Sequence, residues 1–130
     1  MGVLVDYFLI DSDQAAERIL ASGPAGARLP YLDCKGWLDG PDDLAAELSG
    51  RDSSEFGECL PVADDEESSG VDRVADEVVA ALAVIDDSRL REYADDELLA
   101  DYEIERITGL RDLAREAVRL GQGMYRWTCV

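Results

Sequence analysis

The stretch of sequence that decides the fold is residues 101–130, DYEIERITGLRDLAREAVRLGQGMYRWTCV. Apolar residues recur there at intervals of three and four, which predicts an amphipathic helix with one buried stripe. The stripe comprises Ile104, Ile107, Leu110, Leu113, Ala114, Ala117 and Val118. Gly121 and Gly123 follow it, and we expect the helix to end there because a helix C-terminus favours residues that tolerate positive φ.

Residues 124–130, MYRWTCV, predict a closing strand because they are rich in aromatic and β-branched residues. Side chains alternate between the two faces of a strand, so Tyr125, Trp127 and Cys129 would share one apolar face. A second strand is predicted at residues 3–10, VLVDYFLI, whose almost continuous apolar run is typical of a strand buried on both faces.

Asp6 interrupts this N-terminal run. A buried carboxylate without a partner is costly. We therefore expect Asp6 to pair with Arg126 or with backbone amides, unless the strand lies at an edge of the sheet.

The clearest helical spacing in the rest of the chain runs from residue 71 to residue 85. It comprises Val71, Val74, Ala75, Val78, Val79, Leu82 and Ile85. This spacing predicts a helix of about four turns, with Val74, Val78, Leu82 and Ile85 buried together.

The remaining segments predict shorter elements from their capping and turn residues. They are a short helix after Ser12, loops at residues 24–30 and 51–57, a helix from Pro41 to Gly50, an edge strand near residues 58–62, and short helices near residues 88–93 and 97–99. The whole pattern predicts an α/β (α+β) fold in a single domain, residues 1–130. Its small mixed sheet would include the N-terminal and C-terminal strands and pack against several helices.

The chain is strongly acidic, with 30 acidic residues against 12 basic ones and a formal net charge of −18 at neutral pH. Residues 36–105 carry most of the excess, since they hold 23 acids and 4 arginines. Like charges repel, which argues against nucleic acid or an anionic membrane surface as a partner. The same acidity permits a basic protein as a partner.

No apolar run approaches the roughly 18–20 residues that a membrane-spanning helix needs. The N-terminal run also lacks the basic region of a signal peptide, so we expect a cytoplasmic protein. Cys34, Cys59 and Cys129 are odd in number and far apart, which favours buried thiols over disulfides. With no histidine and no CxxC pair, the chain offers no metal-ligand set, and no cofactor is predicted.

Several segments carry a family resemblance. They are LPV at residues 60–62, VDRVADEVVAALAVIDDSRLREY at residues 71–93, LRDLAREAVRLGQG at residues 110–123, MYRWTCV at residues 124–130, and the apolar N-terminal strand with Tyr7 and Phe8 after Met1-Gly2. With these segments the chain resembles the YfbM-like family, a group of small bacterial proteins of unknown function. The resemblance implies an α/β fold and brings no established activity.

Leu32 and Asp33, with Lys35 and Trp37, are similar to a place where that family tends to have an aspartate, a lysine and a tryptophan close together. The chain departs from the family immediately afterwards, because Leu38 stands where the family often has a histidine. Any function that rests on that histidine would be absent here.

Two acidic clusters are candidate surfaces for a partner. The first comprises Asp64, Asp65, Glu66 and Glu67, and the second comprises Asp95, Asp96 and Glu97, with Asp101 and Glu103 nearby. The first cluster lacks the spacing and the turn glycine of an EF-hand, which makes a divalent cation the weaker interpretation. Docking of a basic protein and simple solvation both remain open for each cluster.

Asp33, Lys35 and Trp37 form a third candidate site, because a lysine near a carboxylate and an aromatic ring could line a small-molecule pocket. Lys35 is the only lysine in the chain. The plainer interpretation is that Trp37 packs structurally while Lys35 and Asp33 form a surface pair.

Arg111, Arg115 and Arg119 recur every fourth residue on one face of the C-terminal helix. They could bind a phosphate-bearing ligand. More simply, they could pair with Asp112, Glu116 or the acidic middle of the chain.

Catalytic motifs are absent from the sequence, which has no nucleophile elbow, phosphate loop or dinucleotide fingerprint. Without histidine, a general base would have to be a carboxylate or a thiolate. We therefore expect a non-enzymatic protein-binding domain whose acidic middle contacts a basic partner, as an immunity protein, an inhibitor or a charge mimic does. The alternative is a small-molecule-binding or enzymatic domain with a pocket near Asp33, Lys35 and Trp37.

The excess of carboxylates predicts that salt stabilises the fold, because self-repulsion opposes the compact state and salt screens it. We expect the melting temperature to rise as sodium chloride increases from roughly 10 mM to a few hundred mM, where the Debye length falls below about 10 Å. Differential scanning calorimetry would measure this. A melting temperature that stays constant or falls would contradict the prediction.

Overall fold

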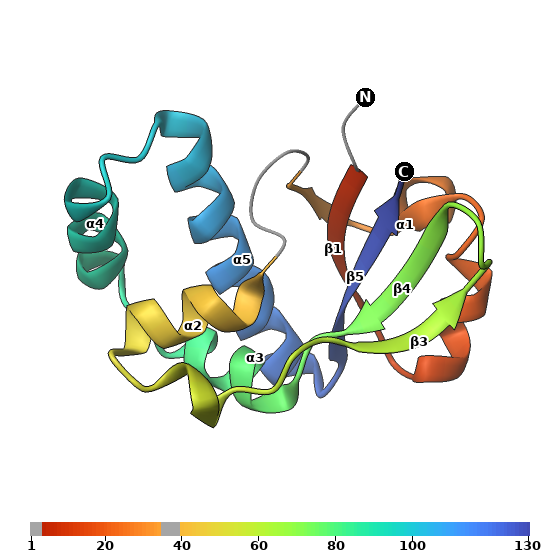
Figure 1. Ribbon diagram of the computed structural model, residues 1–130, viewed down its shortest axis with the longest axis horizontal. Coiled ribbons are helices and arrows are strands. Elements are labelled where there is room, and N and C mark those ends of the chain that lie inside the picture. Colours follow the sequence, from red (N-terminus) through yellow and green to blue (C-terminus); the bar gives the residue numbers. More distant parts are fainter. Residues whose placement is uncertain (1–3, 35–39) are drawn as a thin grey trace.

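The computed structural model describes residues 4–34 and 40–130 (Figure 1). Within these ranges, five strands form one sheet in the order β2-β1-β5-β4-β3, with antiparallel pairing throughout. The strands are β1 (Leu4–Ile10), β2 (Tyr31–Asp33), β3 (Leu60–Asp64), β4 (Ser69–Arg73) and β5 (Gly123–Cys129). The 3-10 helices are η1 (Asp13–Arg18) and η2 (Ser53–Glu55), and the α-helices are α1 (Gly23–Gly26), α2 (Pro41–Ser49), α3 (Asp76–Ala83), α4 (Asp87–Asp96) and α5 (Asp101–Leu120).

The pairing of β1 with β5 lies at the centre of the sheet. Its register runs from Leu4 opposite Cys129 to Ile10 opposite Gly123. The rings of Phe8 and Tyr125 stack across it with their centroids 6.0 Å apart. The predicted α+β fold with both terminal strands in one sheet is therefore confirmed, although the observed pairings are all antiparallel rather than mixed.

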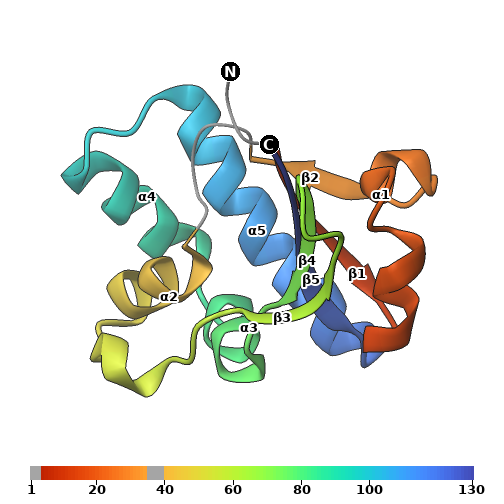
Figure 2. The same ribbon diagram turned by 45° about the vertical axis from the view of Figure 1, so that its right-hand side comes forward.

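Helices lie on both sides of the sheet (Figure 2). On one side are α2, α3, α4 and α5, and the strands contribute Val5, Tyr7 and Met124 to the core there. On the other side are η1 and α1, which cover a second core that includes Phe8 and Trp127. The prediction that the N-terminal strand is buried on both faces is thus confirmed.

The buried stripe of α5 follows the predicted spacing through Ile107, Leu110, Ala114 and Ala117. Val118 was assigned to the same stripe wrongly, since it is exposed. It stands one residue beyond Ala117, about 100° further round the helix, outside the arc that the core covers. Although α5 has 20 residues, no helix in the described ranges is long and apolar enough to cross a membrane.

The helix predicted from residue 71 to residue 85 is wrong in its first part. Residues 69–73 form β4, and α3 begins only at Asp76. Because β4 pairs with β3 on one side and β5 on the other, its ladder hydrogen bonds outweigh the local helical spacing. Val71 consequently packs in the second core, whereas Val74 packs in the first.

Smaller differences concern the ends of short elements. The predicted loop at residues 24–30 contains all of α1 except its first residue, and the predicted loop at residues 51–57 contains the whole of η2. One helix, α4, runs to Asp96 where a short helix near residues 88–93 was predicted, and residues 97–99 form a turn rather than another helix. The helix that begins at Pro41 and ends before Gly50 is confirmed, as are the edge strand at Pro61 and the short helix after Ser12.

Val74, Val78, Leu82 and Ile85 are buried in the same core cluster, as predicted. A buried and an exposed valine of α3 allow a matched test of this packing. Val78 is fully buried in α3, whereas Val84, at the end of the same helix, is 79% exposed. Val78→Asp should lower the free energy of unfolding by about 3–4 kcal/mol, because it buries an unpaired carboxylate. Val84→Asp should lower it by less than about 1 kcal/mol. Equal effects of the two variants in urea titrations would contradict the packing described here.

Candidate functional site

The first acidic cluster lies at the tip of the β3–β4 hairpin, and we call Asp64, Asp65, Glu66 and Glu67 the hairpin cluster. The carboxylate of Asp65 accepts three backbone N–H bonds within the turn, at 2.9–3.0 Å. These bonds, that from Ser69 foremost, hold the pKa of Asp65 below its usual range because they favour the charged form. Asp64 likewise accepts a bond from the N–H of Glu66. Two of the four carboxylates therefore shape the turn, a role that needs no partner.

The second acidic cluster lies where the chain turns from α4 into α5, and we call Asp95, Asp96 and Glu97 the corner cluster. Asp95 and Asp96 occupy the last turn of α4, and Glu97 is its C-cap. A helix C-terminus carries partial negative charge, so each carboxylate there costs roughly 0.3–1 kcal/mol. None of the three forms an ion pair within the part of the chain that the structure describes.

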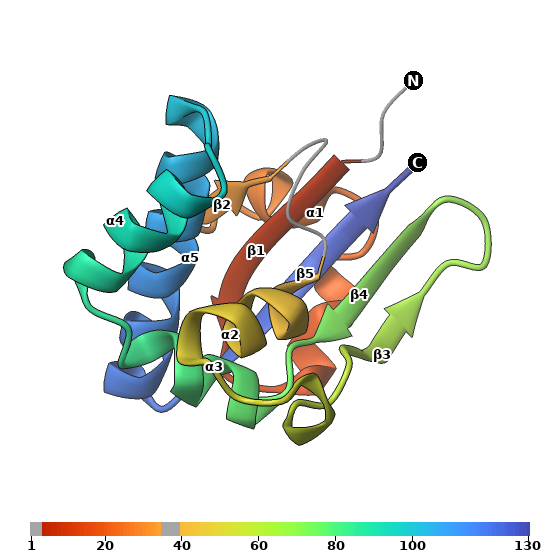
Figure 3. The same cartoon turned by 60° about the vertical axis from the view of Figure 1, so that its left-hand side comes forward.

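The two clusters lie at opposite ends of the molecule. Figures 1 and 3 place α4 at the left and the tip of the β3–β4 hairpin at the right, with the rest of the fold between them. The two clusters therefore do not form one continuous surface. Each cluster has to be considered as a separate surface.

The corner cluster is followed by an unusual residue, Leu98. The N–H of Leu99 bonds to the carbonyl of Ala94 at 3.0 Å, and the N–H of Leu98 bonds to that of Asp95 at 3.3 Å. This is the Schellman arrangement, which requires a left-handed residue at the position after the C-cap and usually has glycine there. Leu98 occupies that position with φ 53°. Its side chain is 89% exposed, so burial does not compensate for the backbone strain.

Two other helix ends have glycine at positive φ, whereas Arg28 takes the equivalent left-handed position after α1, with φ 61°. Gly50 ends α2 and Gly121 ends α5, both with positive φ. Four residues after Leu98, Tyr102 is 55% exposed, and the guanidinium of Arg106 lies 5.1 Å above the centroid of its ring. The α4–α5 corner thus exposes two large apolar side chains beside three carboxylates that have no cationic partner among the described residues.

The third predicted site is only partly described by the structure. Asp33 is the last residue of β2, and Lys35 and Trp37 lie outside the described residues. Asp33 stands directly opposite Asp6 in the antiparallel β1–β2 pair. A pocket formed with Lys35 and Trp37 therefore stays a prediction. The structure does show that the carboxylate-bearing residues Asp33 and Asp6 are paired across the two strands.

Asp6 does not have the partner that its position in the sequence suggested. It faces Asp33 and Trp127 across its two neighbouring strands, whereas Arg126 stands opposite Tyr7 and pairs with Asp72 at 2.6 Å. Successive side chains of a strand point to opposite faces, so a one-residue difference in register separates Asp6 from Arg126. Nor does β1 lie at an edge, because β2 and β5 flank it. Burial first, and Asp33 second, raise the pKa of Asp6 to about 6.

Three of the arginines of α5, the series Arg111, Arg115 and Arg119, are engaged in structural bonds. Arg111, which is buried, donates to the carbonyl of Ile85 at 2.8 Å and pairs with Asp87 and Asp112. Arg115 donates to the carbonyls of Ala83 and Ile85, both at 2.8 Å. These bonds satisfy the carboxyl end of α3.

Arg119 pairs with Glu116 on the surface of the same helix. The simpler interpretation of the arginine series, pairing with nearby acidic groups, is therefore confirmed for Arg111 and Arg119. Phosphate binding would have to displace carbonyl and carboxylate partners already in place.

The thiols are poorly suited to catalysis. Burial raises the pKa of Cys34 to about 12 and that of Cys59 to about 11, so both stay protonated at neutral pH. All three cysteines are free, as predicted, but only Cys34 is buried, whereas Cys59 and Cys129 are partly exposed. Across residues 4–34 and 40–130, no three carboxylates or thiols are arranged to hold a metal ion.

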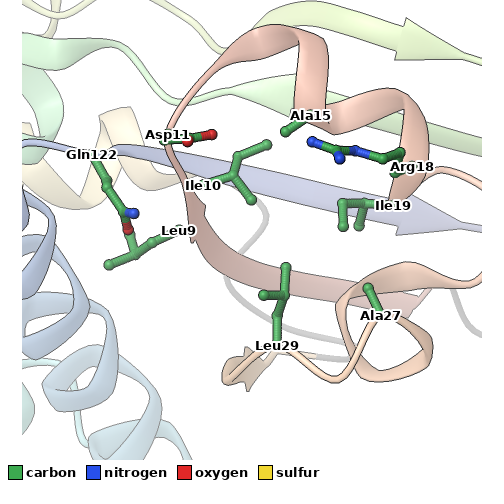
Figure 4. A pocket seen from close by; sticks show the side chains of 9 residues that line it. All are labelled: Leu9, Ile10, Asp11, Ala15, Arg18, Ile19, Ala27, Leu29 and Gln122. Atoms are coloured by element: carbon green, nitrogen blue, oxygen red, sulfur yellow. The ribbon is translucent and has the colours of Figure 1, made fainter.

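A pocket of about 410 Å³ lies on the side of the sheet that η1 and α1 cover (Figure 4). Its floor and walls are mostly apolar, and Asp11, Arg18 and Gln122 supply the polar groups. The lining residues are Leu9, Ile10, Asp11, Ala15, Arg18, Ile19, Ala27, Leu29 and Gln122. No sequence pattern indicated this pocket, because its residues come from β1, η1, the segment after α1 and the turn before β5.

No protein-family model, curated protein or solved structure matches this chain. The similarity to the YfbM-like family therefore stays a prediction from the sequence. A fold does not specify a function by itself, so the functional argument rests on the residues of this chain.

Leu98 is the residue that sequence reasoning missed. A signal was available in residues 95–99, DDELL, because the helix ends there without the glycine or asparagine that usually marks such an end. The two leucines instead suggested another helical turn. Only the backbone shows which leucine takes the left-handed conformation and which one packs against the core.

The raised pKa of Asp6 predicts a pH-dependent loss of stability. The folded pKa of about 6 exceeds the reference value of 3.8, so the folded state binds the proton more tightly than the unfolded state. The contribution of Asp6 to the free energy of unfolding is therefore greatest below about pH 4 and declines as the pH rises through about 6. At neutral pH the free energy of unfolding is lower by about 2–3 kcal/mol than it would be without this shift.

Asp6→Asn should raise the free energy of unfolding at neutral pH and flatten its decline between about pH 4 and pH 6. Asp11→Asn, which changes an exposed carboxylate just beyond the same strand, is the matched control and should leave that slope in place. Urea titrations at several pH values measure both. The assignment fails if Asp6→Asn and the wild type keep parallel pH profiles.

Proposed function

We propose that this protein is a non-enzymatic binding domain that contacts a basic protein through the α4–α5 corner, formed by Asp95, Asp96, Glu97, Leu98 and Tyr102. The observation that carries the proposal is Leu98, an exposed leucine in a left-handed conformation. Residues held in strained backbone conformations without a packing benefit tend to occur at functional sites. A glycine at this position would stabilise the fold, whereas a leucine offers an apolar side chain to a partner.

The charges around Leu98 support the same interpretation. Three carboxylates stand at the negative end of α4, where stability favours basic residues, and they have no cationic partner within residues 4–34 and 40–130. A partner that brings lysine or arginine side chains to this end of the helix would remove both their mutual repulsion and the unfavourable interaction with the helix. Electrostatic attraction of this kind raises association rates and selects partners by charge.

The chemistry of the partner follows from the corner. Leu98 and Tyr102 would insert into an apolar depression, while the rim of that depression would present basic groups to Asp95, Asp96 and Glu97. Apolar anchors inside a polar rim are the usual arrangement of binding energy at protein interfaces. Inhibition of a basic protein, by an immunity protein or a charge mimic, is the concrete form of this function.

The hairpin cluster remains a second candidate surface within the same proposal. Asp64 and Asp65 are used in the turn, which leaves Glu66 and Glu67 for contact with a partner. The free thiols suit a cytoplasmic protein, because disulfides form mainly in oxidising compartments.

The test compares variants of the two surfaces in a pull-down from native extract, with bound proteins quantified by mass spectrometry. A corner variant carries Asp95→Asn, Asp96→Asn and Glu97→Gln, and a matched hairpin variant carries Glu66→Gln and Glu67→Gln. We expect a basic protein to bind the wild type, to dissociate as salt increases, and to be lost from the corner variant only. Loss from the hairpin variant alone would transfer the function to the hairpin, and retention by both would contradict the proposal.

Leu98 allows a sharper test, because its roles in stability and binding have opposite signs. Leu98→Gly should raise the free energy of unfolding by about 1 kcal/mol, since glycine adopts positive φ without steric cost. The same variant should lose the partner, while Leu98→Met, which keeps an apolar side chain, should retain it. A stabilised Leu98→Gly protein that binds its partner as well as the wild type would show that Leu98 is not an anchor.

A further inference from the structure

The pocket beside η1 lies on the far side of the sheet from the α4–α5 corner, and it combines an apolar interior with two opposite charges. Ile10, Ala15 and Ile19 are buried and form part of its lining. Its volume of about 410 Å³ falls within the range of roughly 300–1,000 Å³ that is usual for small-molecule sites. The pocket is therefore large enough for a compact ligand with an apolar body.

The two charged groups at the pocket, Asp11 and Arg18, form no ion pair with each other. In Figure 4 the guanidinium of Arg18 and the carboxylate of Asp11 point toward one another, with Ile10 below the space between them. They form no ion pair with each other, and neither forms one with another group among residues 4–34 and 40–130. A donor group and an acceptor group thus border the same opening with space between them.

A ligand that fits this arrangement needs an anionic and a cationic group close together, with an apolar group beyond them. A free α-amino acid with a large apolar side chain has this chemistry. We infer that the pocket binds such an amino acid: Arg18 donates to its carboxylate, Asp11 accepts from its ammonium group, and its side chain enters the space lined by Ile10, Ile19 and Leu29. Bonds between charged groups are the stronger class of hydrogen bond, so two of them can select a zwitterion.

The probe is L-leucine, titrated into the full chain while NMR follows the methyl groups of Ile10, Ile19 and Leu29. We expect saturable shifts confined to the pocket, with an affinity in the millimolar range because the two charged groups are exposed. Two analogues separate the charges: 4-methylpentanoate lacks the ammonium group, and 3-methylbutylamine lacks the carboxylate. Each should bind about tenfold more weakly than leucine. Glycine, which keeps both charges, should also bind more weakly because it leaves the apolar space empty.

Three variants assign the contacts. Arg18→Gln and Asp11→Asn should each weaken leucine binding about tenfold. Ala27→Phe, at the exposed rim, should block binding by filling the pocket. Arg91→Gln changes an exposed arginine on α4 that has no ion pair among the described residues, so it is the matched control and should bind leucine as the wild type does.

The inference would be overturned if L-leucine produced no saturable shifts at the pocket. It would also be overturned if 4-methylpentanoate or 3-methylbutylamine bound as well as leucine, since recognition would then not depend on paired charges. If Arg18→Gln and Asp11→Asn bound leucine as the wild type does, the inference would likewise be overturned, because neither charge would then contribute to recognition. A circular dichroism melt of each variant shows whether it is folded, so loss of binding is interpreted only for variants that melt cooperatively.

Discussion

The antiparallel pairing of β1 with β5 brings opposite ends of the sequence together, and the other strands attach to this pair. β2 adds to the free side of β1, and β4 adds to the free side of β5. Closing a chain segment of this length is entropically unfavourable, so burial on both faces of the pair has to compensate. Tyr7, Phe8, Met124 and Tyr125 supply that burial, since each is completely inaccessible to solvent. The central pair therefore explains why both terminal strands are rich in apolar residues although the chain as a whole is acidic.

The helical layer takes its position from the same pair, because α5 continues through Gly121 directly into β5. Arg111 then fixes α3 and α4 to α5, with a buried guanidinium that reaches both Ile85 and Asp87. At the other side of α4, Arg89 donates to the carbonyls of Glu47 and Leu48 in α2. The α4–α5 corner lies beyond these attachments. Backbone strain at the corner destabilises only the end of α4. Leu98 in its left-handed conformation and the three carboxylates therefore have little effect on the stability of the core.

Elements with one dominant physical cause could be predicted from the sequence. The stripe of α5 and the apolar run of β1 are examples, because burial of one face or of both faces determines them directly. Val71 could not be placed, since its helical spacing competes with pairing to strands that are remote in sequence. Asp6 and Arg126 are similar, because a shift of one residue in register decides which face each occupies. The candidate surfaces were located as sequence clusters, but Leu98 depends on a backbone angle that sequence spacing does not reveal.

The charge pattern distinguishes structural acidic groups from those that lack a structural role. Net charge of either sign keeps a protein soluble, so solubility does not require carboxylates at the C-terminal end of a helix. In the hairpin cluster, Asp65 accepts hydrogen bonds from the backbone of its own turn and so stabilises it. The carboxylates of the corner cluster instead interact unfavourably with the negative C-terminal end of α4. Arg18 and Asp11 present the converse case, since opposite charges that would gain by meeting stay apart beside an apolar pocket. In both places the folded chain leaves an electrostatic interaction incomplete, and a molecule of complementary charge is what would complete it.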